Sequence, residues 1–235
     1  MPKEINCALL LAAGSGARMQ GSVADKILAP IRGIPAFIYS LRTFAGCDLI
    51  DSICIVYRDE AQQKELATAL DPAMRAVVIW AQGGTERQDS VFSGLQALPE
   101  ATSHTLIHDC ARPLISPELI ARLIDTARSD GAACLAHPVT DTVKRIPAAG
   151  EIKQTVLEDL QRDRLWAMET PQAFRHAEIL KAYRYATAQN LRITDDCAAA
   201  ACIGLKTSII HNTDPNPKIT TAADLAYIQW LLATA

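Results

Sequence analysis

The sequence predicts an α/β fold in which helices flank a mostly parallel sheet. Through the N-terminal half, short apolar runs alternate with amphipathic stretches, a rhythm that is typical of parallel strands joined by helices. The first apolar run, residues 6–12, passes directly into a loop that contains Gly14 and Gly16. Because ligands bind beyond the carboxyl ends of the strands in such sheets, this loop lies where a site is expected.

Each element of the N-terminal half follows from its own pattern. Apolar runs predict strands at residues 6–12, 50–56, 76–80, 105–108 and 132–136. Amphipathic stretches predict helices at residues 34–44, 60–70, 85–98 and 117–129. The last helix has the clearest start, because Ser116 suits the cap, Pro117 the first helical position and Glu118 the first turn.

The pattern changes after Pro138. Residues 138–146 alternate, a break follows at 147–150, and a strand-like pattern resumes at 151–157, which predicts a projecting hairpin, a β-arm, over about 138–164. An isolated hairpin with little apolar surface is marginal in water, so we expect the arm to pack on a second subunit. The whole chain, 1–235, is then a single domain with a dimerisation arm.

The chain beyond the arm returns to the α/β pattern. We expect residues 166–174 to rejoin the body and helices to follow at 175–189 and 194–202. A strand at 206–211 and a closing helix at 221–232 complete the predicted fold.

Composition restricts the classes of function. At 235 residues, 49% of them hydrophobic, the chain has ample material for one large core. A net charge of −3 gives no support for nucleic acid as a partner, and no apolar run is long enough to span a membrane. The N-terminus lacks the shape of a signal peptide, and the seven cysteines form no C-x-x-C pair. We therefore expect reduced thiols and a cytoplasmic location.

The glycine loop has the features that a nucleoside triphosphate requires. Gly14 and Gly16 allow close approach of the main chain, and successive free N–H groups bind anions. Arg18 and Lys26 add two cations. The spacing G-x-G-x-R is neither a dinucleotide fingerprint nor a P-loop, so a plain tight turn with solvated cations is the alternative. Residues 83–90 and 109–112 also follow predicted strands and should meet this loop.

Motifs spread over nearly the whole chain resemble the 2-C-methyl-D-erythritol 4-phosphate cytidylyltransferase family. They are A-A-G-S-G-A-R-M at 12–19, G-G-T-E-R-Q-D-S-V at 83–91, H-D-C-A-R-P at 108–113, D-T-V-K-R at 141–145, L-W-A-M-E-T-P-Q at 165–172, I-T-D-D at 193–196 and K-I-T at 218–220. The resemblance implies a Rossmann-like fold of the nucleotidyltransferase type. It also implies transfer of a cytidylyl group from CTP to the methylerythritol phosphate, with release of pyrophosphate, in non-mevalonate isoprenoid synthesis.

The resemblance implies a set of site residues. The catalytic cations are Arg18, Lys26 and Lys218. The nucleotide-binding residues are Ala12, Ala13, Gly14, Ser15, Gly16, Gly84, Thr85, Ser90 and Asp109. The substrate-binding residues are Asp109, Arg112, Thr142, Arg162, Thr170 and Lys218, of which Thr142 and Arg162 act across the dimer. Mg²⁺, or another divalent cation, is expected mainly on the triphosphate oxygens, without a set of protein ligands.

Several of these residues have a plainer explanation, and the chain departs from the family in places. Asp109 could be a turn aspartate, Arg112 a surface charge that pairs with it, and Ser90 an ordinary helix serine; Arg164 competes with Arg162 for the role across the dimer. Residues 25–28 read D-K-I-L where the family usually has P-K-Q-Y in its P-K-Q-Y-L run, one extra residue lies between Arg18 and Lys26, and Leu11 and Thr85 replace the usual proline and aspartate.

Three other functions share some of the features. A cytidylyltransferase for another polyol phosphate, such as ribitol 5-phosphate, would have the same nucleotide motifs. A non-catalytic nucleotide-binding module would not need the full set of cations. A dinucleotide-dependent oxidoreductase fails because the third glycine and the ribose-binding acid are missing.

Overall fold

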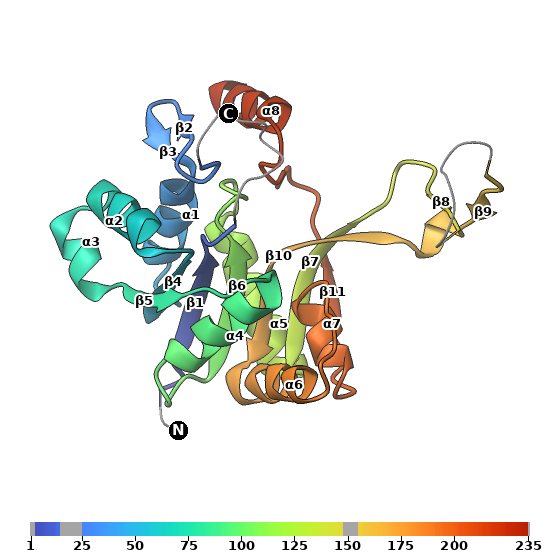
Figure 1. Ribbon diagram of the computed structural model, residues 1–235, viewed down its shortest axis with the longest axis horizontal. Coiled ribbons are helices and arrows are strands. Elements are labelled where there is room, and N and C mark those ends of the chain that lie inside the picture. The colour runs from blue at the N-terminus through green and yellow to red at the C-terminus, as the bar shows by residue number, and fades with distance from the viewer. Residues whose placement is uncertain (1–2, 15–24, 148–154, 235) are drawn as a thin grey trace.

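The computed structural model describes residues 3–14, 25–147 and 155–234 (Figure 1). A seven-stranded sheet has the order β11-β7-β10-β6-β1-β4-β5. Its strands are β1 (Asn6–Leu11), β4 (Ser52–Tyr57), β5 (Ile79–Gln82), β6 (His104–Asp109), β7 (Ala132–Pro138), β10 (Trp166–Arg175) and β11 (Ser208–His211). All neighbours pair parallel except β10, which runs antiparallel to both β6 and β7. The predicted mostly parallel α/β fold is confirmed, and β10 is the exception.

Helices cover both faces of this sheet. The cores place α1 (Ala36–Ala45), α2 (Glu60–Ala69), α5 (Pro117–Asp130) and α8 (Ala222–Thr234) on one face, and α4 (Arg87–Ala97), α6 (His176–Ala188) and α7 (Asp196–Ala201) on the other. Along β1 the side chains of Ala8 and Leu10 enter the first core, while those of Cys7 and Leu9 enter the second. This burial on both faces explains why the strand reads as a continuous apolar run.

Close packing of α4 on the sheet depends on Gly94. A Cβ atom there would lie 2.4 Å from Cδ1 of Leu9 and 2.7 Å from Cγ2 of Val56. Only glycine lets the helix lie this close to β1 and β4. The approach fixes the N-terminus of α4, and with it Arg87, beside the carboxyl ends of the strands.

Several element boundaries differ from the sequence prediction. Residues 76 and 77, predicted as strand, belong to the helix α3 (Pro72–Val77), which was not predicted. Its N-terminus is capped by the Asp71 carboxylate, which accepts from the N–H of Met74 at 2.8 Å. Residues 34 and 35, predicted as helix, form β3 (Ile34–Pro35), which pairs with β2 (Pro30–Ile31) in a small hairpin before α1.

A second small sheet lies apart from the body. β8 (Lys144–Arg145) and β9 (Glu158–Asp159) pair antiparallel, and Figure 1 shows them well to one side of the central sheet. β8 lies within the predicted stretch 138–146, but β9 comes later than the predicted 151–157: residues 155–157 are not strand, and residues 148–154 lie outside the described part. The role of this segment in dimerisation, and the single-domain boundary 1–235, stay predictions. Within the described residues, no helix has the length and apolar character needed to cross a membrane.

Candidate active site

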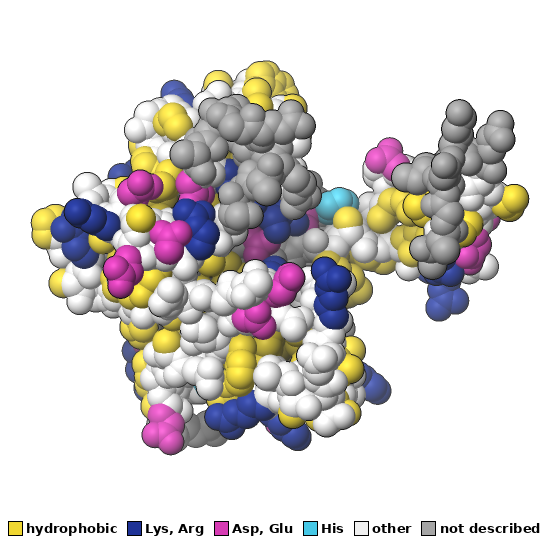
Figure 2. Space-filling model, viewed as in Figure 1, with side chains coloured by type: hydrophobic (Ala, Val, Ile, Leu, Met, Phe, Trp, Pro, Cys, Tyr) yellow, Lys and Arg dark blue, Asp and Glu magenta, His cyan; other side chains and the backbone are white. Residues whose placement is uncertain are grey.

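A cavity of about 630 Å³ opens at the carboxyl ends of the central strands. The loops after β1, β5 and β6 line it together. The sequence analysis expected these loops to meet, and their described parts do. Figure 2 shows acidic and basic side chains next to each other in the hollow near the centre of this face. The lining residues are Leu11, Ala12, Ala13, Gly14, Lys26, Ile27, Arg58, Gly84, Thr85, Glu86, Arg87, Ser90, Asp109, Ala111, Lys218 and Thr220.

Most of the predicted nucleotide-binding residues meet at this cavity. Seven of them line it, as do Lys26 and Lys218 among the predicted catalytic cations. The remaining predicted residues of the glycine loop, namely Ser15, Gly16 and Arg18, lie outside the described residues. The structure therefore brings together the base-side and phosphate-side candidates that it describes.

Ser90 shapes the loop that precedes α4. Its hydroxyl accepts from the N–H of Gly84 at 3.1 Å and donates to the carbonyl of Glu86 at 3.2 Å. A Cβ on Gly83 would lie 2.7 Å from this hydroxyl and 2.8 Å from Cβ of Ala13. The serine therefore holds the main chain of the loop beside the loop after β1, which is more than an ordinary helix-face serine does.

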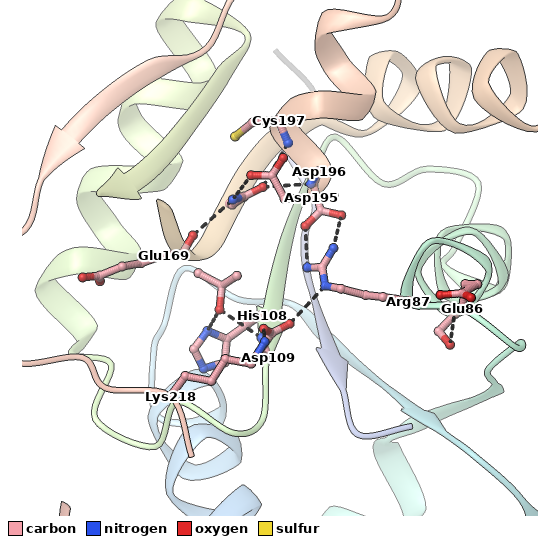
Figure 3. Close-up of polar contacts among 12 residues, drawn as sticks. Glu86, Arg87, His108, Asp109, Glu169, Asp195, Asp196, Cys197 and Lys218 are labelled. Carbon is pink, nitrogen blue, oxygen red and sulfur yellow. Dashed lines mark hydrogen bonds and ion pairs between the residues drawn. The ribbon is translucent and has the colours of Figure 1, made fainter. Parts of the chain in front are cut away.

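Asp109 lies at the end of β6 between two cations (Figure 3). Its side chain accepts from Nζ of Lys218 on one oxygen and from Nε of Arg87, at 3.4 Å, on the other. Burial alone would raise the pKa of Asp109, but the charges of Arg87 and Lys218 outweigh it and hold the pKa well below its usual range. Asp109 opens the turn in which the N–H of Arg112 donates to its main-chain carbonyl at 2.9 Å, and its side chain is a charged, oriented group of the cavity.

Arg87 and Asp196 form an ion pair that the sequence analysis did not assign. Two nitrogens of the Arg87 guanidinium donate to the carboxylate of Asp196 at 3.1 and 2.8 Å, and the hydroxyl of Tyr183 donates to the same carboxylate at 2.5 Å. Asp196 is fully buried. Both residues stand in quoted motifs, G-G-T-E-R and I-T-D-D, but their partnership across 109 residues left no local signal.

Glu169 holds the loop that leads to Lys218. One oxygen of this buried carboxylate accepts from the side-chain amides of Asn212 and Asn216 at 2.9 and 2.8 Å, and the other accepts from the ring of His137 at 2.7 Å. The main-chain carbonyl of Asn216 accepts from Nη1 of Arg112 at 2.5 Å. The alternative explanation of Arg112, a surface charge that pairs with Asp109, is therefore wrong. Arg112 instead holds the loop that leads to Lys218.

The other predicted substrate-binding residues do not line the cavity of this chain. Thr170 is buried behind it, where its hydroxyl accepts from the N–H of Asp109 at 3.0 Å. Thr142 and Arg162 are exposed in the segment around β8 and β9, and Nη1 of Arg162 donates to the carbonyl of Thr140 at 3.0 Å. No group of three or more His, Cys, Asp or Glu side chains gathers to hold a metal in residues 3–14, 25–147 and 155–234.

Comparison with known proteins decides the family. The family model described as "IspD: 2-C-methyl-D-erythritol 4-phosphate cytidylyltransferase" matches residues 6–234. The chain belongs to the 2-C-methyl-D-erythritol 4-phosphate cytidylyltransferase family. This agrees with the motifs and with the cavity that they line.

Relatives in both sequence and structure agree with this membership. The 2-C-methyl-D-erythritol 4-phosphate cytidylyltransferase of a Synechococcus species is 38% identical over 95% of this chain and 94% of its own. The enzyme of the same name from Symbiobacterium thermophilum is 34% identical over 95% and 91%. The crystal structure of 4-diphosphocytidyl-2C-methyl-D-erythritol synthase from Anaerococcus prevotii is 29% identical, covers 98% of this chain and 96% of its own, and has a TM-score of 0.81.

His108 is a buried residue that contacts two of the residues around the cytidylyltransferase site, Arg112 and Thr170. Its fully buried ring contacts the carbonyl of Arg112 through Nε2 at 3.0 Å and the hydroxyl of Thr170 through Nδ1 at 3.2 Å. A neutral ring satisfies both, because Nε2–H donates to the carbonyl while the hydroxyl donates to Nδ1 and accepts from Asp109. Burial lowers the pKa of His108 to about 4.

This low pKa predicts a loss of stability in mild acid. The unfolded chain, with a histidine pKa of 6.5, binds a proton between pH 6.5 and about 4 that the folded chain refuses, so stability falls as the pH drops through this window. The full effect is roughly 3 kcal/mol. NMR titration of the His108 ring should give a midpoint near 4, and a midpoint at 6 or above would contradict the buried neutral ring.

Proposed function

We infer that this chain transfers a cytidylyl group from CTP to 2-C-methyl-D-erythritol 4-phosphate in isoprenoid precursor synthesis. The observation that carries the inference is the cavity in which Lys218 and Asp109 lie beside the loops after β1 and β5. The family model matches the chain from residue 6 to 234, so it includes all of these segments. A phosphate oxygen of the methylerythritol phosphate forms a bond to the α-phosphorus of CTP. The bond from that phosphorus to the bridging oxygen breaks, and pyrophosphate leaves with the electron pair.

The attacking group is already an anion, so the reaction needs no strong base. It needs two polyanions to be aligned and the added charge at phosphorus to be stabilised. We propose that Lys218 supplies a cation at the α-phosphate and the attacking phosphate, with Lys26 and Arg18 on the triphosphate. Asp109, which accepts from Lys218 on one side and Arg87 on the other, orients Lys218 before substrate arrives.

The base and the second substrate have separate candidates. We propose that main-chain groups of Ala12, Ala13, Gly84 and Thr85, with the hydroxyl of Ser90, read the edge of the cytosine ring, since all five residues line the cavity. We propose that Arg112 and Thr170 position groups that bind the second substrate. Thr170 accepts from the N–H of Asp109, and Arg112 donates to the carbonyl of Asn216 in the loop that leads to Lys218.

Mg²⁺ fits this cavity as a partner of the nucleotide. Asp109 and Glu86 are the carboxylates that line it, and the two cations on Asp109 leave it poorly placed as a metal ligand. Mg²⁺ usually keeps several waters and takes substrate phosphates with one or two carboxylates. We propose that it binds with CTP, mainly through triphosphate oxygens, where it would neutralise phosphate charge.

The arm and the cysteines support two further proposals. Val156, Leu157 and Ile146 near β8 and β9 expose 87%, 53% and 47% of their surface, which favours contact with a second copy. In such a homodimer Thr142 and Arg162 would reach the partner's cavity. All seven cysteines are free, five of them buried, which supports a reducing compartment such as the cytoplasm.

The decisive experiment is a pyrophosphate-release assay with Mg²⁺. It crosses CTP, UTP, ATP and GTP with methylerythritol phosphate and ribitol 5-phosphate. We expect turnover only with CTP and methylerythritol phosphate, and loss of turnover when EDTA removes the metal. Turnover with ribitol phosphate alone would contradict the proposed substrate, and a folded protein that is silent throughout would contradict the activity.

Replacing Lys218 tests the proposed chemistry. Lys218→Ala removes a positioned cation, which should lower turnover by at least about 100-fold while the fold persists. Lys206→Ala, at an exposed lysine that does not line the cavity, is the matched control and should leave turnover unchanged. Near-normal turnover in the Lys218 variant would refute its role.

Arg162 and its neighbour Arg164 test the proposed action across the dimer. Arg162→Ala should raise the KM for methylerythritol phosphate about tenfold, the loss expected for a charge-assisted hydrogen bond, with little change in CTP affinity. Arg164→Ala should change neither. Equal weakening of both substrates, or a larger effect at Arg164, would show that the assignment to Arg162 is wrong.

A further inference from the structure

Arg58 is a cation of the cavity to which neither the motifs nor the family comparison assigns a role. It follows directly on β4, so it lies at the carboxyl end of the strand next to β1. It lines the same cavity as Lys26 and Gly14. Its side chain is 37% exposed.

Two carboxylates fix the orientation of the Arg58 guanidinium. Nε donates to Asp59 at 2.7 Å, and Nη1 donates to the buried carboxylate of Asp25 at 3.2 Å. At the other end, its main-chain N–H donates to Oε1 of Gln62 at 2.6 Å. Because two carboxylates hold the guanidinium and Gln62 holds the main chain of the same residue, this side chain loses less conformational freedom on binding an anion than a free surface arginine does.

The residues that contact Arg58 also contact the loop after β1 and the segment that carries Lys26. The buried side-chain amide of Gln62 donates to the carbonyl of Ala12 at 3.0 Å and to Asp25 at 2.6 Å. The other oxygen of Asp25 accepts from the N–H of Ile27 at 3.2 Å, one residue beyond Lys26. The position of Arg58 is therefore set relative to the loop after β1 and to Lys26.

The guanidinium keeps hydrogen-bonding capacity toward the cavity. Among the described residues, Nη2 of Arg58 has no hydrogen-bond partner, so both of its N–H groups can donate to a ligand. The other cations that line the described cavity besides Lys26 are Arg87 and Lys218, and both are engaged by Asp109. A nucleoside triphosphate carries about four negative charges, and arginine binds phosphate oxygens well.

We propose that Arg58 binds the triphosphate of the nucleotide, as a cation in addition to Lys26. This inference rests on the proposed function, since it takes CTP as the occupant of the cavity. It also accounts for Asp25, which stands where the family usually has proline and here ties Arg58 to the segment that carries Lys26.

The test compares ligands that differ in their phosphates. CTP, and CMP with its single α-phosphate, are titrated calorimetrically in the presence of Mg²⁺ into the wild type and into Arg58→Gln. We expect the Kd for CTP to rise about tenfold, the loss of a charge-assisted hydrogen bond, and that for CMP to stay within about twofold. Arg58→Met, which keeps much of the aliphatic side chain, should give the same result and serves if the glutamine variant does not fold.

A matched control comes from Arg128. It also donates to two carboxylates, Glu4 at 2.7 Å and Asp125 at 2.8 Å, and is 43% exposed, but it does not line the cavity. Arg128→Gln should leave both affinities unchanged. An unaltered CTP affinity at Arg58, or an equal loss for CTP and CMP, would overturn the inference. A wild type that binds no CTP would instead overturn the proposed function.

Discussion

Asp109 and Asp196 are two carboxylates that are buried in the folded chain. The need to place hydrogen-bond donors and cations beside them determines how the elements around the site are arranged. An ionised carboxylate without a partner in the interior costs several kcal/mol, so each needs a cation at hydrogen-bond distance. Arg87 contacts both, while Lys218 completes Asp109 and the Tyr183 hydroxyl completes Asp196. Strand β6, helices α4, α6 and α7 and the loop before α8 must therefore converge at one place.

Because of this convergence, the packing of the core determines the positions of the charged side chains in the site. Arg87 reaches both carboxylates because α4 lies close to β1 and β4, which requires the missing side chain of Gly94. Burial raises the pKa of Tyr183, so its hydroxyl keeps the proton that it donates to Asp196. The cations of the cavity are thus oriented by the folded chain itself, and less reorganisation remains to be done when a polyanionic substrate binds.

Much of the fold could be predicted from the sequence because β1, β4, β6 and β7 are buried on both faces and read as continuous apolar runs. The convergence of their loops followed from the topology. Tertiary pairings such as those of Arg87 with Asp196 and of Asp25 with Arg58 could not be predicted, because charged residues far apart in the chain leave no periodic pattern. The antiparallel direction of β10 was also hidden, since it depends on the chain leaving and re-entering the sheet around β8 and β9.

That excursion of the chain bears directly on Lys218. His137 lies where β7 leaves the sheet, and Glu169 lies within the register shift of β10 between Met168 and Gln172. At this shift the ladder of main-chain hydrogen bonds is interrupted, and the Glu169 carboxylate joins His137 to the amides of Asn212 and Asn216. The base of the segment that carries β8 and β9 therefore shares one buried anchor with the loop that ends in Lys218. Side-chain hydrogen bonds therefore tie the base of this segment to the loop that carries Lys218, where the ladder of the sheet is interrupted.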